Sequence, residues 1–138
     1  MSLRIARRTC LFIDQRIVMS NLELKRAHVG KRLSEYAVYN GVVYLAGQVP
    51  EVDPKADIRG QTREVLGHID RLLAEAGSDK TRILSCQIFL TSIDLIGEMN
   101  EVWDAWVPQG NTPPRATVEA RLANPDYLIE VVVTAALN

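Results

Sequence analysis

The amino-acid sequence predicts an α+β protein in which one mixed sheet carries two helices on one face. Three observations lead to this prediction. Two segments show the apolar periodicity of helices, and the other apolar segments alternate or run as strands do. Along the chain, strands are followed by a helix, a strand, a second helix and two strands. The length of 138 residues, with 47% apolar and 24% charged residues, fits one globular domain.

The first helix is predicted over residues 57–77. Asp57 suits its amino end, because an aspartate oxygen accepts hydrogen bonds from free backbone N–H groups. Gly77 suits its carboxyl end, because glycine adopts the left-handed conformation that stops a helix. The apolar face between them carries Val65, Leu66, Ile69, Leu72, Leu73 and Ala76.

The second helix is predicted over residues 94–107, and Pro108 ends it. Its apolar face carries Leu95, Ile96, Met99, Val102, Trp103, Trp106 and Val107. The two tryptophans favour packing in the core or at an interface over a platform for stacking nucleic-acid bases.

Strands are predicted in the remaining apolar segments. Tyr36–Asn40 and Val42–Ala46 flank an Asn40-Gly41 turn, which is typical of a hairpin. Thr81–Thr91 is a third strand. Arg115–Leu122 alternates, with Arg115, Thr117, Glu119 and Arg121 on its polar face. Tyr127–Leu137 is nearly all apolar, as in strands covered on both faces. Two helices cover one face only, so the other face is expected to meet a partner subunit.

The charge of the chain is unevenly distributed. Residues 1–18 hold four arginines and one aspartate, which gives this segment a charge of +3. Because the net charge of the chain is −1, residues 19–138 together carry a charge of −4. This balance argues against a nucleic-acid-binding protein. Residues 1–18 are either an extension upstream of the domain 19–138 or an expression remnant, or they add a strand over Cys10–Val18.

The location is predicted to be cytoplasmic, and a membrane-spanning segment is not expected. The chain has no apolar run near the roughly 20 residues that cross a bilayer. Two cysteines, Cys10 and Cys86, make no disulfide framework, which favours a reducing compartment. Cys86 lies in an apolar strand and is interpreted as a small buried side chain.

Two charged residues are candidates for chemistry. Arg115 follows two prolines at the start of a strand, where a rigidly held guanidinium suits bidentate capture of a carboxylate. The alternative is a solvated arginine at a strand end. Glu130 lies within an apolar run, where a carboxylate is costly unless it is paired or used. The alternative is an ion pair with Arg115 or Arg121. Neighbouring antiparallel strands would bring Arg115 and Glu130 together.

Other kinds of site find little support. His28 and His68 have no companions at metal-ligand spacing, so a metal is not expected. The serines lack the G-x-S-x-G context of hydrolases, and phosphate-binding glycine motifs are missing from the sequence. Glu119 and Arg121 are interpreted as a solvated or subunit-contact stripe.

Several segments together resemble the Rid/YjgF family, also called the L-PSP endoribonuclease family. The resemblance covers about residues 22–137. Its segments are residues 40–50 (NGVVYLAGQVP), Gln61-Thr62, Ile69-Asp70, residues 72–78 (LLAEAGS), residues 99–103 (MNEVW), Pro114-Arg115, Val118-Glu119 and Ile129-Glu130. Within the family, the chain most resembles the small branch whose second helix ends in Trp-Asp-Ala-Trp-Val, here residues 103–107.

The resemblance implies a chorismate-mutase-like fold with about six strands and a homotrimer with three clefts between subunits. It also implies hydrolysis of reactive enamines and imines, such as 2-aminoacrylate, to a keto acid and ammonia without a cofactor. Arg115 and Glu130 match the catalytic positions, and both are expected to face the same intersubunit hollow. Gly47, Ala46, Asn100 and Thr117 match substrate-binding positions.

The sequence departs from the family pattern at three places. Ala46 replaces a common serine, Thr117 replaces a common cysteine, and Leu33 or Ser34 falls where many members have a pocket tyrosine. These departures bear on substrate choice and activity. Two alternatives to the deaminase stand: a trimer that binds a small carboxylate without catalysis, which the missing tyrosine and cysteine favour, and an endoribonuclease or translation inhibitor, which the older name of the family suggests.

Overall fold

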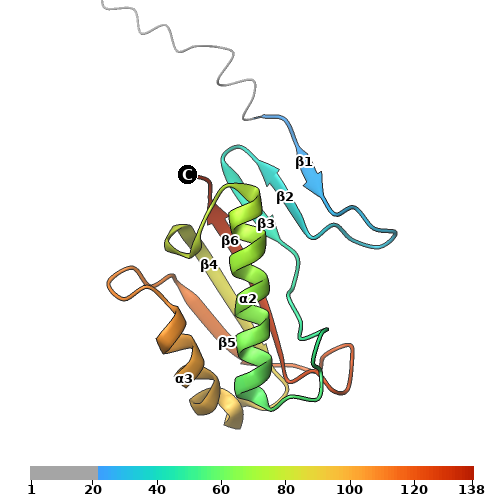
Figure 1. Cartoon of the computed structure of the whole chain (residues 1–138), viewed down its shortest axis with the longest axis vertical. Coiled ribbons are helices and arrows are strands. Elements are labelled where there is room, and N and C mark those ends of the chain that lie inside the picture. The colour runs from blue at the N-terminus through green and yellow to red at the C-terminus, as the bar shows by residue number, and fades with distance from the viewer. Residues whose placement is uncertain (1–21) are drawn as a thin grey trace, which may run out of the picture.

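The computed structural model describes residues 22–138, which form one sheet and two long helices (Figure 1). The proposed roles of residues 1–18, including a strand over Cys10–Val18, lie outside the described residues. In chain order the elements are β1 (Lys25–Ala27), β2 (Tyr36–Tyr39), β3 (Val42–Leu45), α2 (Ile58–Ala76), the 3-10 turn η1 (Lys80–Arg82), β4 (Ile83–Leu90), the 3-10 turn η2 (Ile93–Leu95), α3 (Ile96–Trp106), β5 (Arg115–Glu119) and β6 (Ile129–Ala136).

The first long helix, α2, begins and ends where its caps were predicted. The Asp57 carboxylate accepts a hydrogen bond from the Gly60 backbone N–H at 2.8 Å, which satisfies one of the free donors of the first turn. Gly77 adopts a φ of 89° and closes the last turn onto Ala74 and Leu73. The second helix differs slightly from its prediction, because its first turn is the 3-10 turn η2.

The sheet has the strand order β1-β2-β3-β6-β4-β5. All neighbouring strands are antiparallel except β4 and β5, which run parallel and are connected through α3. The β2–β3 hairpin turns at Asn40 and Gly41, whose φ values of 50° and 76° match the tight turn predicted there. Strand β5 ends at Glu119, three residues earlier than predicted.

The core lies between the sheet and the two helices. The apolar face of α2 packs on alternate residues of β6, of which Ile129, Val131, Val133 and Ala135 are all buried. Burial of each large side chain stabilises the fold by about 1.5–3 kcal/mol. The other face of the sheet, called the open face here, is covered by neither α2 nor α3 (Figure 1). The prediction of an α+β sheet with both helices on one face is confirmed.

Candidate functional site

The six residues predicted to form the site fall into two groups. Arg115 and Thr117 on β5 lie beside Asn100 on α3, and together with Trp103 they form what we call the arginine cluster. Glu130 on β6 lies beside Gly47 and the neighbouring Ala46, which follow β3; we call these three the glutamate cluster.

The arginine cluster holds the guanidinium of Arg115 from two sides. Its Nη1 donates a hydrogen bond of 2.9 Å to Oδ1 of Asn100. Its Cζ lies 5.0 Å from the centre of the Trp103 ring, within the range of a cation–π contact. Asn100 and Trp103 are three residues apart on α3, so both side chains leave the helix toward β5. Neither partner is negatively charged, so the arginine keeps its full positive charge.

Two further side chains lie on the same face as Arg115. The hydroxyl of Thr117 is buried and has no hydrogen-bond partner among the described residues. Such a group is costly unless a ligand or water satisfies it. Cys86 lies opposite Arg115 in the β4–β5 register. Burial raises the pKa of the Cys86 thiol to about 12, although the nearby Arg115 opposes this rise. Cys86 is therefore a protonated thiol at neutral pH rather than a nucleophile.

The glutamate cluster is built by close approach of the backbone. A β-carbon at Gly47 would overlap Oε1 of Glu130, so this position requires glycine while the carboxylate stays where it is. Gln48 anchors the segment: its backbone exchanges hydrogen bonds of 2.8 and 3.0 Å with Val131, and its side chain donates to the Ala46 carbonyl at 3.0 Å. These bonds hold the backbone of Gly47 against β6.

The two clusters point to opposite faces of the sheet. Arg115 lies beside Cys86, whose side chain is in the core beneath the helices. Glu130 pairs with Phe89, whose neighbours on β4 point into the core, so Glu130 points to the open face. The prediction that adjacent antiparallel strands bring Arg115 and Glu130 together is wrong within one chain, because β4 lies between β5 and β6. An ion pair between these two side chains of one chain is excluded by the same geometry.

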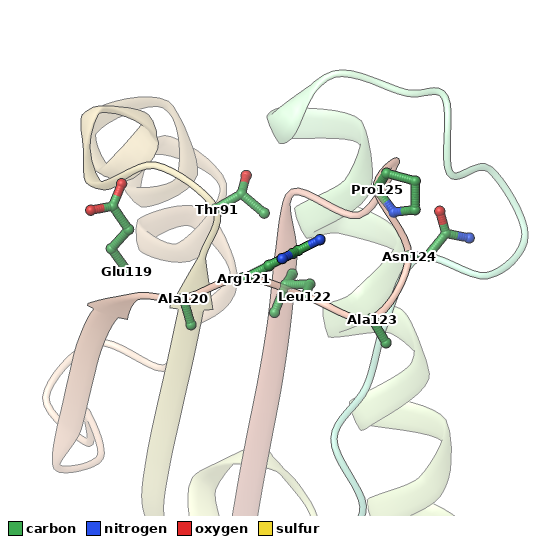
Figure 2. Close-up of a pocket in the computed structure, with 8 residues that line it drawn as sticks. All are labelled: Thr91, Glu119, Ala120, Arg121, Leu122, Ala123, Asn124 and Pro125. Carbon is green, nitrogen blue, oxygen red and sulfur yellow. The ribbon is translucent and has the colours of Figure 1, made fainter.

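Two hollows of the described chain lie away from both clusters. One of about 610 Å³ is formed by Thr91 and by residues 119–125, which cross the end of the sheet (Figure 2). The side chain of Arg121 extends along it toward Pro125 (Figure 2). A second hollow, of about 550 Å³, lies between α2 and α3. Neither of these two hollows is lined by any of the six predicted residues.

Two further features of residues 22–138 bear on other kinds of site. No three His, Cys, Asp or Glu side chains gather as metal ligands within this range. None of the helices described there is long and apolar enough to span a membrane. The histidines pair with carboxylates instead: His28 bonds Glu75 at 2.8 Å, and His68 bonds Glu64 at 2.9 Å.

Sequence reasoning missed the contact of Trp103 with the arginine. It assigned both tryptophans to packing, and this holds for Trp106, whose Nε1 donates to Asp70 of α2 at 2.9 Å. Trp103 is 5% exposed and also belongs to the core, but its ring faces the guanidinium. A signal was present in the sequence. Because residues three apart lie on the same face of a helix, a site that includes the side chain of Asn100 is expected to include that of Trp103 as well.

The comparisons with known proteins agree on one family. A family model described as endoribonuclease L-PSP matches residues 24–137. A RutC family protein of Haemophilus ducreyi is 49% identical over 115 residues, which cover 83% of this chain and 97% of the relative. The RutC family protein YoaB of Escherichia coli is 37% identical over 116 residues, covering 84% of this chain and all of the relative.

A solved structure shows the same fold. It is the crystal structure of NMB1025 from Neisseria meningitidis, a member of the YjgF protein family. The two chains superpose with a TM-score of 0.81 at 43% sequence identity, over 86% of this chain and 98% of the other.

Proposed function

The chain belongs to the endoribonuclease L-PSP family, also called Rid/YjgF, and on that premise we propose that it hydrolyses small, reactive imines and enamines bearing a carboxylate. The products are a keto acid and ammonia. The observation that carries the proposal is the Arg115 guanidinium, which Asn100 and Trp103 hold without neutralising it. An oriented, uncompensated guanidinium suits a ligand carboxylate, which it binds through two parallel hydrogen bonds.

The proposed reaction is balanced by one water. For 2-aminoacrylate, the imine tautomer accepts the water oxygen at the carbon that bears nitrogen. The carbon–nitrogen bond of the resulting carbinolamine then breaks, nitrogen leaves as ammonia, and the carbon becomes the ketone of pyruvate. No electrons are exchanged, so the reaction requires proton transfers and positioning only.

Each cluster has a separate role in this proposal. Arg115 binds the carboxylate and fixes the distance of the imine carbon from the reacting water. Glu130 orients that water and carries a proton to the departing nitrogen. The backbone at Gly47, which leaves room for the Glu130 carboxylate, lines the same space. Asn100 orients the arginine, since its Oδ1 accepts a hydrogen bond from Nη1.

Two copies of the chain are needed to unite these roles. Arg115 and Glu130 point to opposite faces of one sheet, so in our proposal Arg115 of one copy meets Glu130 of a neighbouring copy. The open face supports this assembly, because it exposes apolar side chains: Tyr39, Tyr44 and Val118 are 42%, 50% and 47% exposed. A homotrimer would cover these residues and form three such clefts.

The activity is tested by coupling the purified protein to a dehydratase that releases 2-aminoacrylate and following the formation of pyruvate. We expect Arg115→Ala to lower the acceleration about a hundredfold and Glu130→Gln to lower it about ten- to a hundredfold. Arg121→Ala is the matched control, because Arg121 lies in the hollow beyond β5 and contacts neither cluster. Wild-type activity in Arg115→Ala would overturn the proposal.

The shared site is tested by mixing two inactive variants. When Arg115→Ala and Glu130→Gln chains are unfolded and refolded together, each mixed trimer regains one intact cleft. Random assembly from equal amounts then restores about a quarter of the wild-type activity. Mixtures that stay as inactive as the separate variants would show that the two residues do not act across an interface.

A second candidate function is carboxylate binding without catalysis. The separation of Arg115 and Glu130 within one chain favours it, because binding requires the arginine cluster alone. Pyruvate binding that Arg115→Ala abolishes, in a protein that does not accelerate ammonia release, would support this candidate. The charge of −4 on residues 19–138 argues against the ribonuclease function that the family description names.

A further inference from the structure

We propose that Trp103 is a positioning residue that sets the plane of the Arg115 guanidinium and so selects which of its edges meets a carboxylate. The inference rests on the proposed function, because it concerns how the same arginine binds its ligand. Two contacts of the guanidinium support it. The guanidinium carbon lies 5.0 Å from the centre of the Trp103 ring, and Nη1 donates to Asn100 at 2.9 Å.

The two contacts constrain different motions of the side chain. The hydrogen bond to Asn100 engages one terminal nitrogen, but by itself it allows the group to swing about that bond. The ring of Trp103 restricts this swing because it lies against the guanidinium. Among the described residues, no acceptor engages Nε or Nη2 of Arg115. The Nε–Nη2 edge is therefore the edge left for bidentate binding.

The nature of these partners matters as much as their positions. An arginine held by an aspartate or glutamate is already neutralised, and an incoming carboxylate would have to displace that partner. An indole ring and an amide orient the cation while leaving its charge available. The Trp103 ring is almost fully buried, so it is itself fixed by the core and does not move with the arginine. The arginine cluster is thus prepared before the ligand arrives.

The tryptophan also provides an optical signal. The sequence contains two tryptophans, Trp103 and Trp106, whose ring centres lie 5.3 Å apart. In a Trp106→Phe chain, Trp103 is the one remaining indole, and a carboxylate bound to Arg115 changes the charge beside it. We expect pyruvate to shift its fluorescence, with a midpoint equal to the Kd found by calorimetry. A chain that carries both Trp106→Phe and Arg115→Ala should show no fluorescence shift with pyruvate.

The decisive experiment compares Trp103 variants in two backgrounds, with pyruvate as the probe and calorimetry as the measurement. With Arg115 present, we expect Trp103→Leu to raise the Kd about tenfold, and Trp103→Phe to raise it about threefold because a smaller aromatic face remains. In the Arg115→Lys background, the same Trp103 substitutions should raise the Kd for pyruvate less than about twofold, because an ammonium group has no plane to orient. Trp106→Phe is the control and should leave the Kd unchanged.

Each outcome distinguishes the inference from the proposed function. Equal losses in both backgrounds, or tight binding by a folded Trp103→Leu chain, would overturn the role of Trp103 while leaving Arg115 as the carboxylate-binding residue. Wild-type pyruvate binding by Arg115→Ala, or none by the wild-type protein, would instead overturn the proposed function. If Trp103→Leu does not fold, Trp103→Phe decides the matter, and an unchanged Kd would refute the inference.

Discussion

The carboxylate of Glu130 lies directly against the α-carbon of Gly47. A β-carbon at position 47 would overlap Oε1 of Glu130 and lie 3.0 Å from its Cδ. The two residues are far apart in the sequence but come from neighbouring strands, because Gly47 follows β3 and Glu130 lies on β6, which pairs with β3. The absence of a side chain at position 47 leaves room for this carboxylate on the open face.

Gly47→Ala should therefore displace Glu130 while leaving the fold intact. We expect a loss of activity of about a hundredfold, since a shift of about 1 Å in a reacting group has effects of this size. The free energy of unfolding should fall by less than about 1 kcal/mol, because the overlapped atoms all belong to the flexible Glu130 side chain, which can move away. Coupled pyruvate release and urea unfolding measure the two effects.

Two matched variants separate this contact from a general effect of glycine replacement. Gly67→Ala lies within α2, where nothing approaches within 4 Å, and should keep full activity and gain about 0.5–1 kcal/mol of stability. Adding Glu130→Asp to Gly47→Ala shortens the acid and should recover part of the lost stability. A Gly47→Ala chain as active as wild type would show that the position of Glu130 is unimportant.

Thr117→Val should not destabilise the protein. The hydroxyl of Thr117 is buried without a partner among the described residues, and valine has the same shape without the unsatisfied oxygen. We expect an unchanged or increased free energy of unfolding, by up to about 1 kcal/mol. If the hydroxyl donates to a ligand bound at Arg115, the Kd for pyruvate rises about five- to tenfold.

Thr62→Val is the control for this change. The Thr62 hydroxyl is equally buried but donates a 2.6 Å hydrogen bond to the Ile58 carbonyl, so its removal should cost about 1 kcal/mol. Urea unfolding of both variants tests the contrast. A comparable loss of stability in Thr117→Val would mean that its hydroxyl has a partner in the free protein.

Gln61→Leu should destabilise the protein by about 3 kcal/mol or more. Gln61 is 1% exposed, and its amide nitrogen donates to the carbonyls of Pro54, Ala56 and Asp126. Its oxygen accepts the backbone N–H of Leu128 at 2.7 Å. Leucine would leave all of these backbone groups without their partner.

The exposed Gln109 gives the comparison for Gln61. Gln109→Leu should change the free energy of unfolding by less than about 0.5 kcal/mol. Since Leu128 directly precedes β6, Gln61→Leu should also lower activity through Glu130. Equal stabilities of the two variants in urea would contradict the role assigned to Gln61.

Glu64 should contribute stability that disappears in acid. Burial raises the pKa of this carboxyl, but hydrogen bonds from the Val52 and Asp53 backbone N–H groups, with a further bond from His68, outweigh it and hold the pKa below its usual range. Because the pKa of Glu64 is lower in the folded state, this carboxylate contributes to the free energy of unfolding at pH values above its unfolded pKa, near 4.5. That contribution is lost as the pH falls below this value and through the folded-state pKa.

Glu64→Gln should accordingly be less stable than wild type at neutral pH, with the difference shrinking below about pH 4. Urea unfolding at several pH values measures it. Glu51→Gln replaces an exposed glutamate, and its free energy of unfolding should differ little from that of the wild type at every pH. A Glu64→Gln difference that stays constant across the acid range would contradict this origin of the stability.

Local patterns were sufficient to predict the helices and the first hairpin. The caps of α2 depend on Asp57 and Gly77, and the hairpin turn depends on Asn40 and Gly41, all within a few residues of the structure they determine. The order of the strands could not be predicted in this way. Segments β5 and β6 are consecutive in the sequence, yet residues 120–128 carry the chain past the end of β4, which pairs with both.

The arrangement of the site depends on that order. By itself the sequence determined which residues share a face of each strand, because side chains alternate with a period of two. It also indicated Arg115 and Glu130 as candidates for the site, because one follows two prolines at a strand start and the other lies within an apolar run. Only the tertiary structure decided which side chains of β5 lie on the same face of the sheet as which side chains of β6. This depends on the register of each strand with β4, which lies between them. That register directs Arg115 toward the helices and Glu130 toward the open face, since one residue of shift in a strand exchanges its two faces.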